Sequence, residues 1–176
     1  MPGDPQNSLP RTDGTLRAVV RTFGLLRRVM DPYFTQFGVS GSQWGVLRAL
    51  HRAETEGHAA LRLTDLCDRL LVRPPSVTGV VDRLQRIGLI ARTKSTEDHR
   101  VREVHLTPAG RERIGRVLEH LPEQHELVLG GLNAAERQQL QQLLGVLAQR
   151  LATLATKSEK GEEGEAVAAM LASELS

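Results

Sequence analysis

The stretch that decides the fold is Thr64–Thr107, which reads TDLCDRLLVRPPSVTGVVDRLQRIGLIARTKSTEDHRVREVHLT. It begins with the apolar spacing of a helix, with Thr64 as the expected N-cap and four side chains expected to be buried, Leu66, Cys67, Leu70 and Leu71. Leu71–Arg73 is a short turn, and Pro74 and Pro75 fit the first turn of a second helix, where a missing N–H costs nothing. We therefore expect two successive helices joined by a tight turn.

The second predicted helix is amphipathic. Its apolar residues recur at i, i+3, i+4 and i+7, namely Val77, Val80, Val81 and Leu84. The opposite face is polar and carries Ser76, Thr78, Gly79, Asp82, Arg83 and Arg86. The backbone amides at the start of this helix point outward at the positive end of the helix dipole, where phosphate binds readily. One face should pack and the other is free to contact a nucleic acid.

A β-hairpin is predicted after the second helix. Gly88 ends the helix, Ile90–Lys94 runs extended into a polar tip at Ser95–Arg100, and Arg102–Leu106 alternates polar and apolar residues on its return. The segment from Leu71 to His105 contains seven basic and four acidic residues, so its net charge is +3. This order of elements predicts a winged helix-turn-helix. The expected fold class is mainly α with a small β-hairpin wing, comprising a DNA-binding lobe and a helical dimerisation region.

Six motifs in this order resemble the MarR family (multiple antibiotic resistance regulator) of bacterial transcription factors. They are Leu63–Leu70 (LTDLCDRL), Pro74–Thr78 (PPSVT), Val81–Leu84 (VDRL), Gly88–Ile90 (GLI), Glu97–Arg100 (EDHR) and Val104–Gly110 (VHLTPAG). The resemblance extends from Leu16 to about Leu154. Two positions depart from the usual pattern, because Arg73 replaces a small N-capping residue and Gly79 replaces a longer polar side chain.

The resemblance implies a DNA-binding set and a division of roles within it. Ser76, Thr78 and Arg83 would read or position the major groove, and Arg100, braced by Asp98, would enter the minor groove. Arg73 would contact the backbone or a base edge near the helix start. The full expected set is Arg73, Ser76, Thr78, Arg83, Arg86, Arg92, Lys94, Asp98 and Arg100.

The rest of the chain is predicted to be helical. Capping boxes open two helices, at Ser40 with Gln43 and at Asn133 with Glu136, and two prolines, Pro32 and Pro122, should kink or interrupt helices. We expect a flexible start (1–14), a winged-helix domain (15–156) and an acidic tail (157–176), which could carry a short helix. Within the domain the DNA-binding lobe spans about 40–107, and the dimerisation helices span about 15–38 and 108–156.

A leucine stripe in the last long helix is too broad for one small lobe to cover. It comprises Leu140, Leu143, Leu144, Leu147, Leu151 and Leu154. A second copy of the chain is the economical partner, which predicts a symmetric homodimer. Such a dimer would place two recognition helices about 34–36 Å apart on a palindromic operator in double-stranded DNA. The alternative is that the stripe packs within one chain.

Composition favours a cytoplasmic protein that is not an enzyme. No apolar run approaches the roughly 20 residues needed to cross a bilayer, and the start of the chain has no signal-peptide pattern. The chain lacks a G-x-S-x-G motif, a glycine-rich phosphate loop and a Cys/His cluster, so neither catalysis nor a cofactor is expected. The formal charge of +2 divides into +5 for residues 1–156 and −3 for the tail.

The resemblance also implies regulation by a small aromatic or phenolic ligand that releases a repressor from DNA. The candidate lining residues are Arg27, Trp44, Arg48 and His51. A redox-responsive regulator is an alternative, although Cys67 occupies a packed position where a thiol is inert. A metal-responsive regulator is another, although none of the six histidines forms an i,i+4 pair, so no metal site is expected. A third alternative is a winged-helix module that binds protein.

Overall fold

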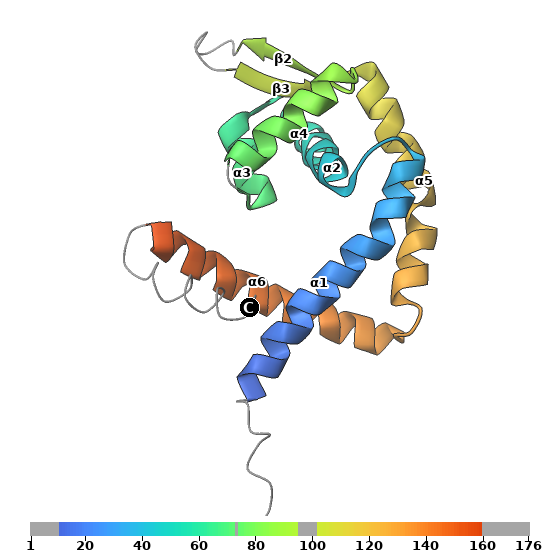
Figure 1. Cartoon of the computed structure of the whole chain (residues 1–176), viewed down its shortest axis with the longest axis vertical. Helices are drawn as coiled ribbons and strands as arrows, with labels where there is room; N and C mark the ends of the chain where they lie inside the picture. Colours follow the sequence, from blue (N-terminus) through green and yellow to red (C-terminus); the bar gives the residue numbers. More distant parts are fainter. Residues whose placement is uncertain (1–10, 73, 95–101, 160–176) are drawn as a thin grey trace, which may run out of the picture. The chain divides into compact units, whose positions relative to one another are not determined.

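The chain is mainly helical, with a small antiparallel sheet, in a computed structural model that describes residues 11–72, 74–94 and 102–159. In chain order the elements are α1 (Arg11–Gln36), α2 (Gly41–Thr55), β1 (Leu61–Arg62), α3 (Leu63–Leu70), α4 (Pro74–Arg86), β2 (Ile90–Lys94), β3 (Arg102–Leu106), α5 (Pro108–Leu129) and α6 (Ala134–Glu159). The predicted fold class is confirmed: α3 and α4 form the helix-turn-helix, and β2 and β3 form the wing (Figure 1).

The described residues fall into two compact units, one ending at Val128 and the other beginning at Leu129. In the first unit α2, α3 and α4 pack together beside the small sheet (Figure 1). The second unit contains α6, which opens with the predicted capping box: the Glu136 amide donates to Asn133 Oδ1 (3.0 Å), and the Asn133 amide donates to Glu136 Oε2 (2.8 Å). None of the described helices is both long and apolar enough to span a membrane.

The sheet has three strands rather than the two expected. The strand order is β1-β3-β2 and all pairs are antiparallel, with Arg92 opposite Val104 in one pair and Leu61 opposite Val104 in the other. β1 has only two residues, so no alternation of polar and apolar side chains could reveal it. Leu61 is buried, and the extra strand fixes the start of α3 against the wing.

Two expectations for the first helix of the motif were wrong. Thr64 is not the N-cap, because α3 begins at Leu63. Arg62, held extended by its pairing with Glu103, takes the cap position without a side-chain capping hydrogen bond. Leu71 is not buried; it ends α3 in the left-handed region (φ 54°) and its side chain is 87% exposed. Helical periodicity cannot place a residue that lies beyond the last helical turn.

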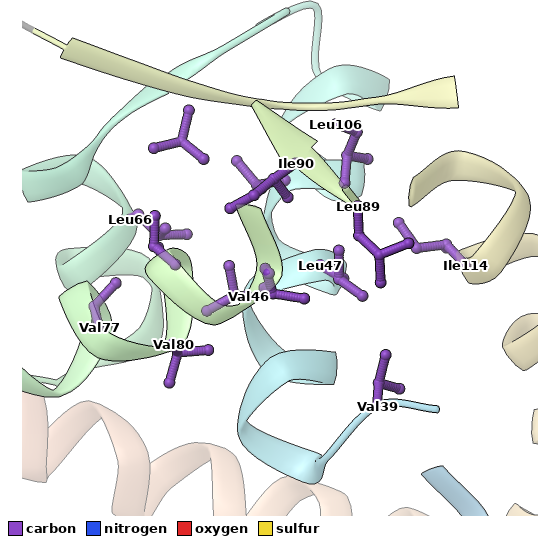
Figure 2. Packing of buried hydrophobic residues seen from close by; sticks show 14 of the residues in the cluster. Val39, Val46, Leu47, Leu66, Val77, Val80, Leu89, Ile90, Leu106 and Ile114 are labelled. Atoms are coloured by element: carbon purple, nitrogen blue, oxygen red, sulfur yellow. The ribbon is translucent and has the colours of Figure 1, made fainter. Parts of the chain in front are cut away.

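The core lies where α2, α3, α4 and the sheet meet. The predicted apolar face of α4 is confirmed, because Val77, Val80, Val81 and Leu84 are all buried. They belong to one cluster with Leu47, Leu66, Ile90, Leu106 and Ile114, part of which is shown in Figure 2. Burying one face of α4 in this way leaves its polar face toward solvent.

The long helices differ from their expected bounds. α1 begins at Arg11, within the segment expected to be flexible, and continues through Pro32, while α5 continues through Pro122. Residues 1–10 and 160–176 lie outside the described part of the chain, so the domain boundaries remain a prediction. The capping box at Ser40 and Gln43 is confirmed at the start of α2.

The start of α5 is fixed against the turn between α4 and β2. Thr107 Oγ1 donates to the Gly88 carbonyl (2.7 Å) and accepts from the Gly110 amide (3.1 Å). Arg111 donates to both carboxylate oxygens of Glu54 on α2, at 3.1 and 2.7 Å. Charge-assisted and bidentate bonds of this kind add directionality to the apolar packing. These bonds tie the start of α5 both to the turn before β2 and to α2.

Candidate nucleic-acid interface

The outward face of α4 carries the polar residues that the sequence predicts. Ser76, Arg83 and Arg86 are exposed, and Thr78 is partly buried. Gly79 leaves room for a side chain, since an added Cβ would meet only Arg83 Nη1 at an ordinary contact distance of 3.8 Å. This face therefore presents hydroxyl and guanidinium groups along one side of a helix, the combination that base edges and phosphates accept.

The wing adds two cations at the outer end of its strands. Lys94 on β2 lies directly opposite Arg102 on β3, and both side chains are exposed. Like charges in directly opposed positions disfavour strand pairing, so the folded chain gains no stability from this arrangement. An anion between or beside the two strands would relieve the repulsion.

Three members of the predicted set lie outside the described residues. Arg73 precedes α4, and Asp98 and Arg100 belong to the segment between β2 and β3. Their predicted contacts with the DNA backbone and the minor groove stay predictions. Of the other six, Ser76, Thr78, Arg83 and Arg86 lie on α4, and Arg92 and Lys94 lie on β2.

Among the described residues of the predicted set, Arg92 makes an ion pair within the chain. Its Nη2 donates to Asp82 Oδ1 at 2.6 Å and its Nη1 donates to Gln85 Oε1 at 3.0 Å, and both acceptors lie on α4. This pairing was not predicted from the sequence. The signal that could have revealed it is the i,i+3 spacing of Asp82 and Gln85, next to a strand that begins after Gly88.

A pocket of about 480 Å³ lies between α2 and α3. Two of the four predicted ligand residues, Trp44 and Arg48, line it, together with Gly45, Ala49, Arg52, Glu56, Arg69 and Leu70. Arg27 and His51 are not among the lining residues: Arg27 is exposed on α1, and His51 is partly buried on α2. Within the described part of the chain, His51 Nδ1 is buried without a hydrogen-bond partner.

The charges of this pocket are organised around Glu56. Its carboxylate accepts a hydrogen bond from Arg69 (2.7 Å) and another from Arg52 (3.2 Å). The Arg69 hydrogen bond is the main reason that the pKa of Glu56 lies below its usual value. The Arg52–Glu56 pair has i,i+4 spacing on a helix, which sequence could have shown, whereas Arg69 comes from α3.

Trp44 supplies the aromatic surface of the same pocket. Its ring stacks on Phe34, with the centroids 5.5 Å apart and the planes at 21°. Arg48 follows one helical turn later on α2 and is exposed. An indole and a guanidinium at this spacing can hold a planar molecule that carries a carboxylate.

Cys67 is buried on α3, with 4% of its surface exposed. Burial, and secondarily the charge of Asp68, raises the pKa of the thiol, so little thiolate forms near neutral pH. Among the described residues no group of three or more His, Cys, Asp or Glu side chains could hold a metal ion.

Comparison with known proteins agrees with this geometry. Residues 37–101 match the sequence model of the MarR family. The repressor MdtR of Bacillus subtilis is 37% identical over 81 residues, which are 46% of this chain and 49% of that protein, so the chain spans about half the length of this curated relative.

Solved structures resemble the fold over most of the chain. A mutant of Escherichia coli MarR in complex with operator DNA is 22% identical with a TM-score of 0.72, and the match covers 82% of this chain and 99% of that one. BpsR of Bordetella bronchiseptica, from a study of how 6-hydroxynicotinic acid regulates its DNA binding, is 24% identical with a TM-score of 0.67 and coverages of 84% and 98%. The matched segment, the ordered motifs and this fold agree, so over residues 37–101 the chain is similar to the MarR family of winged helix-turn-helix proteins.

Proposed function

We propose that the protein is a sequence-specific, DNA-binding transcriptional regulator that acts as a repressor in the cytoplasm. The observation that carries the proposal is the exposed polar face of α4 beside the opposed cations Lys94 and Arg102 of the wing. The relatives support it, since MdtR is named a transcriptional repressor and the MarR-type proteins are regulators rather than enzymes.

Each part of the interface has its own role in this proposal. Ser76, Thr78 and Arg83 face base edges in the major groove, because hydroxyl and guanidinium groups on one helix face can pair with them. Arg86 and Lys94 neutralise phosphates, and Arg73 contacts the backbone or a base edge beside the start of α4. At the wing tip, Arg100 braced by Asp98 occupies the minor groove.

The proposed regulator is a homodimer. Five apolar side chains of α1 are 42–63% exposed in the single chain: Val20, Phe23, Leu25, Leu26 and Val29. Four of α6 are 48–67% exposed: Leu143, Leu144, Val146 and Leu151. Apolar surface of this extent on two long helices is characteristic of an interface, and a second copy of the chain covers it symmetrically. The dimer then presents two recognition helices to a palindromic operator.

A small aromatic acid is the ligand we propose for the pocket between α2 and α3. Trp44 offers aromatic surface and Arg48 offers a cation, while Glu56 already occupies Arg52 and Arg69. A carboxylate ligand would compete with Glu56 for Arg69, which lies on the helix that precedes α4. Binding would release DNA only if the ligand prefers a different placement of the two recognition helices. Regulation of BpsR by 6-hydroxynicotinic acid is a precedent within the fold.

The alternatives have less support. Redox sensing would need an accessible thiolate, whereas Cys67 is buried and its pKa is raised. A protein-binding winged helix would not require Lys94 and Arg102 to face each other on an exposed ladder. We therefore retain one function, the DNA-binding regulator.

A binding titration tests the proposal. The purified protein is titrated against its own upstream intergenic DNA and a scrambled duplex at two salt concentrations, with and without a panel of aromatic acids. We expect salt-dependent binding that prefers the intergenic DNA and is weakened by one of the acids. Equal affinity for both duplexes would contradict sequence-specific regulation at that site, and release by none of the acids would contradict the ligand class.

A further inference from the structure

We infer that Arg92 is a positioning residue, which fixes the recognition helix α4 against the wing, rather than a phosphate contact. The inference rests on the proposed function, because it assigns Arg92 a role in DNA recognition different from that of its neighbours on β2. It follows from the contacts, the local packing and the charge of one cluster, defined as Arg92, Asp82 and Gln85.

The guanidinium of Arg92 joins two successive turns of α4. Nη2 donates to Asp82 Oδ1 at 2.6 Å and Nη1 donates to Gln85 Oε1 at 3.0 Å. Only 24% of the Arg92 side chain is exposed, against 47% of Asp82. Because the guanidinium is planar and its donors have fixed directions, two bonds to acceptors three residues apart resist both sliding and rotation of the helix.

Apolar packing alone does not supply this constraint. Val81, Leu84 and Ile90 bury the inner side of α4 against the sheet, and such contacts have no preferred direction. The turn at Gly88 joins the near end of the helix to β2, where the Leu89 amide donates to the Leu84 carbonyl at 3.0 Å. Arg92, two residues into the strand, adds a second attachment further along α4. The angle between recognition helix and wing is then fixed at two points.

The cluster is also electrically neutral. An unpaired Asp82 on the exposed side of α4 would repel DNA phosphate, and the Arg92 charge compensates it. The pair therefore adds nothing to the number of counterions that DNA binding releases. Lys94, two residues along the same strand and exposed, has no ion pair recorded among the described residues and is the matched control.

The test is a double-variant cycle on the full chain with a defined DNA probe. The variants are Arg92→Gln, Asp82→Asn, the two combined, and Lys94→Gln as the control. The probe is a duplex selected from a random pool by the wild-type protein, with a scrambled duplex of equal composition for comparison. Dissociation constants are measured over a series of salt concentrations, and circular dichroism verifies that each variant is folded.

Positioning and phosphate contact give opposite results in this cycle. We expect each single change to lower probe affinity roughly fivefold, and the double variant to lose no more than the larger single loss, with the wild-type salt slope retained. Lys94→Gln should instead lower the salt slope by about 0.9, the value for one phosphate contact. A double variant whose slope also falls by about 0.9, or an Asp82→Asn variant that binds as tightly as wild type, would overturn the inference.

Amide hydrogen exchange of the free protein separates this inference from the proposed function. Arg92→Gln should speed exchange in the second half of α4 and in β2, whereas Lys94→Gln should not. Identical exchange in the two variants would overturn the positioning role without reference to DNA. A wild-type protein that selects no duplex from the pool would instead contradict the proposed function, while the exchange experiment would still decide the role of Arg92.

Discussion

Replacing Gly110 with alanine should destabilise the protein, although alanine is the better helix former. Gly110 lies in the first turns of α5, and a Cβ built there would sit 2.1 Å from the Leu89 carbonyl oxygen and 3.1 Å from its carbon. The same carbonyl accepts a hydrogen bond from the Thr107 amide at 3.2 Å. Both neighbours are backbone, so neither can move aside by changing a rotamer.

The size of the effect follows from these distances. Carbon and oxygen approach no closer than about 3.3 Å even in favourable C–H···O contacts, so α5 or the turn at Leu89 must shift by about 1 Å. Overpacking of this kind typically costs about 1–3 kcal/mol, and the helix propensity of alanine offsets about 1 kcal/mol of it. The net loss should be up to about 2 kcal/mol, or more if the Thr107 bond also breaks.

Gly115 provides the matched control, because it lies in the same helix with nothing within 4 Å of its built Cβ. Gly115→Ala should raise the free energy of unfolding by up to about 1 kcal/mol. Urea denaturation of both variants measures the difference, and the melting temperature should move by roughly 2–4 °C per kcal/mol. If Gly110→Ala proved as stable as Gly115→Ala, the close approach of α5 to Leu89 would be refuted.

Three further predictions concern DNA, assembly and the thiol. Arg100→Ala should weaken binding to related sites with a shallower salt dependence, whereas Thr78→Ala should change the preference among them; equal losses on specific and random DNA would contradict this division. Phe23→Glu, at a side chain 63% exposed in the single chain, should shift the protein from dimer to monomer in sedimentation, and an unchanged mass would remove α1 from the interface. Since its pKa is raised, Cys67 should react with iodoacetamide far more slowly in the native protein at pH 7 than in denaturant, and rapid native alkylation would show an accessible thiolate.

Local patterns predicted the parts of the fold that local energetics determine. The apolar spacing of α4 placed Val77, Val80, Val81 and Leu84 in the core, because one helix face must be buried. The capping boxes of α2 and α6 were predictable for a similar reason, since each satisfies its own backbone amides within four residues. β1, by contrast, exists only because Leu61 and Arg62 pair with β3, some forty residues later in the chain.

In the candidate site, too, some residues follow from a local pattern and others meet only through tertiary packing. Its exposed α4 residues follow directly from the helix period, so sequence alone could name Ser76 and Arg83. The pairing of Asp82 with Arg92, ten residues away, depends on how β2 folds back along α4. Likewise the resemblance named Trp44 and Arg48 as candidate ligand residues, which stays a prediction, whereas Arg69 lines the pocket beside them only because α3 packs against α2. Side chains that meet through tertiary packing have no period that a sequence could reveal.

The opposed cations of the wing lead to one more prediction. Lys94 and Arg102 face each other at the outer end of the β2–β3 ladder, where like charges weaken strand pairing and no folded-state contact recorded among the described residues compensates them. Lys94→Gln should therefore raise the melting temperature slightly while it weakens DNA binding, a loss of function with a gain of stability.

Salt concentration separates the two effects of this change. Added salt screens the exposed charges, so the gain in melting temperature should shrink between low and high ionic strength. Neutralising Lys94 should also lower the salt slope of DNA binding by about 0.9. If Lys94→Gln melted below wild type at low salt, Lys94 would stabilise the wing. The opposition of Lys94 and Arg102 would then not be evidence for an anion that binds beside them. A residue that disfavours the free fold but strengthens the complex is best explained by a phosphate contact.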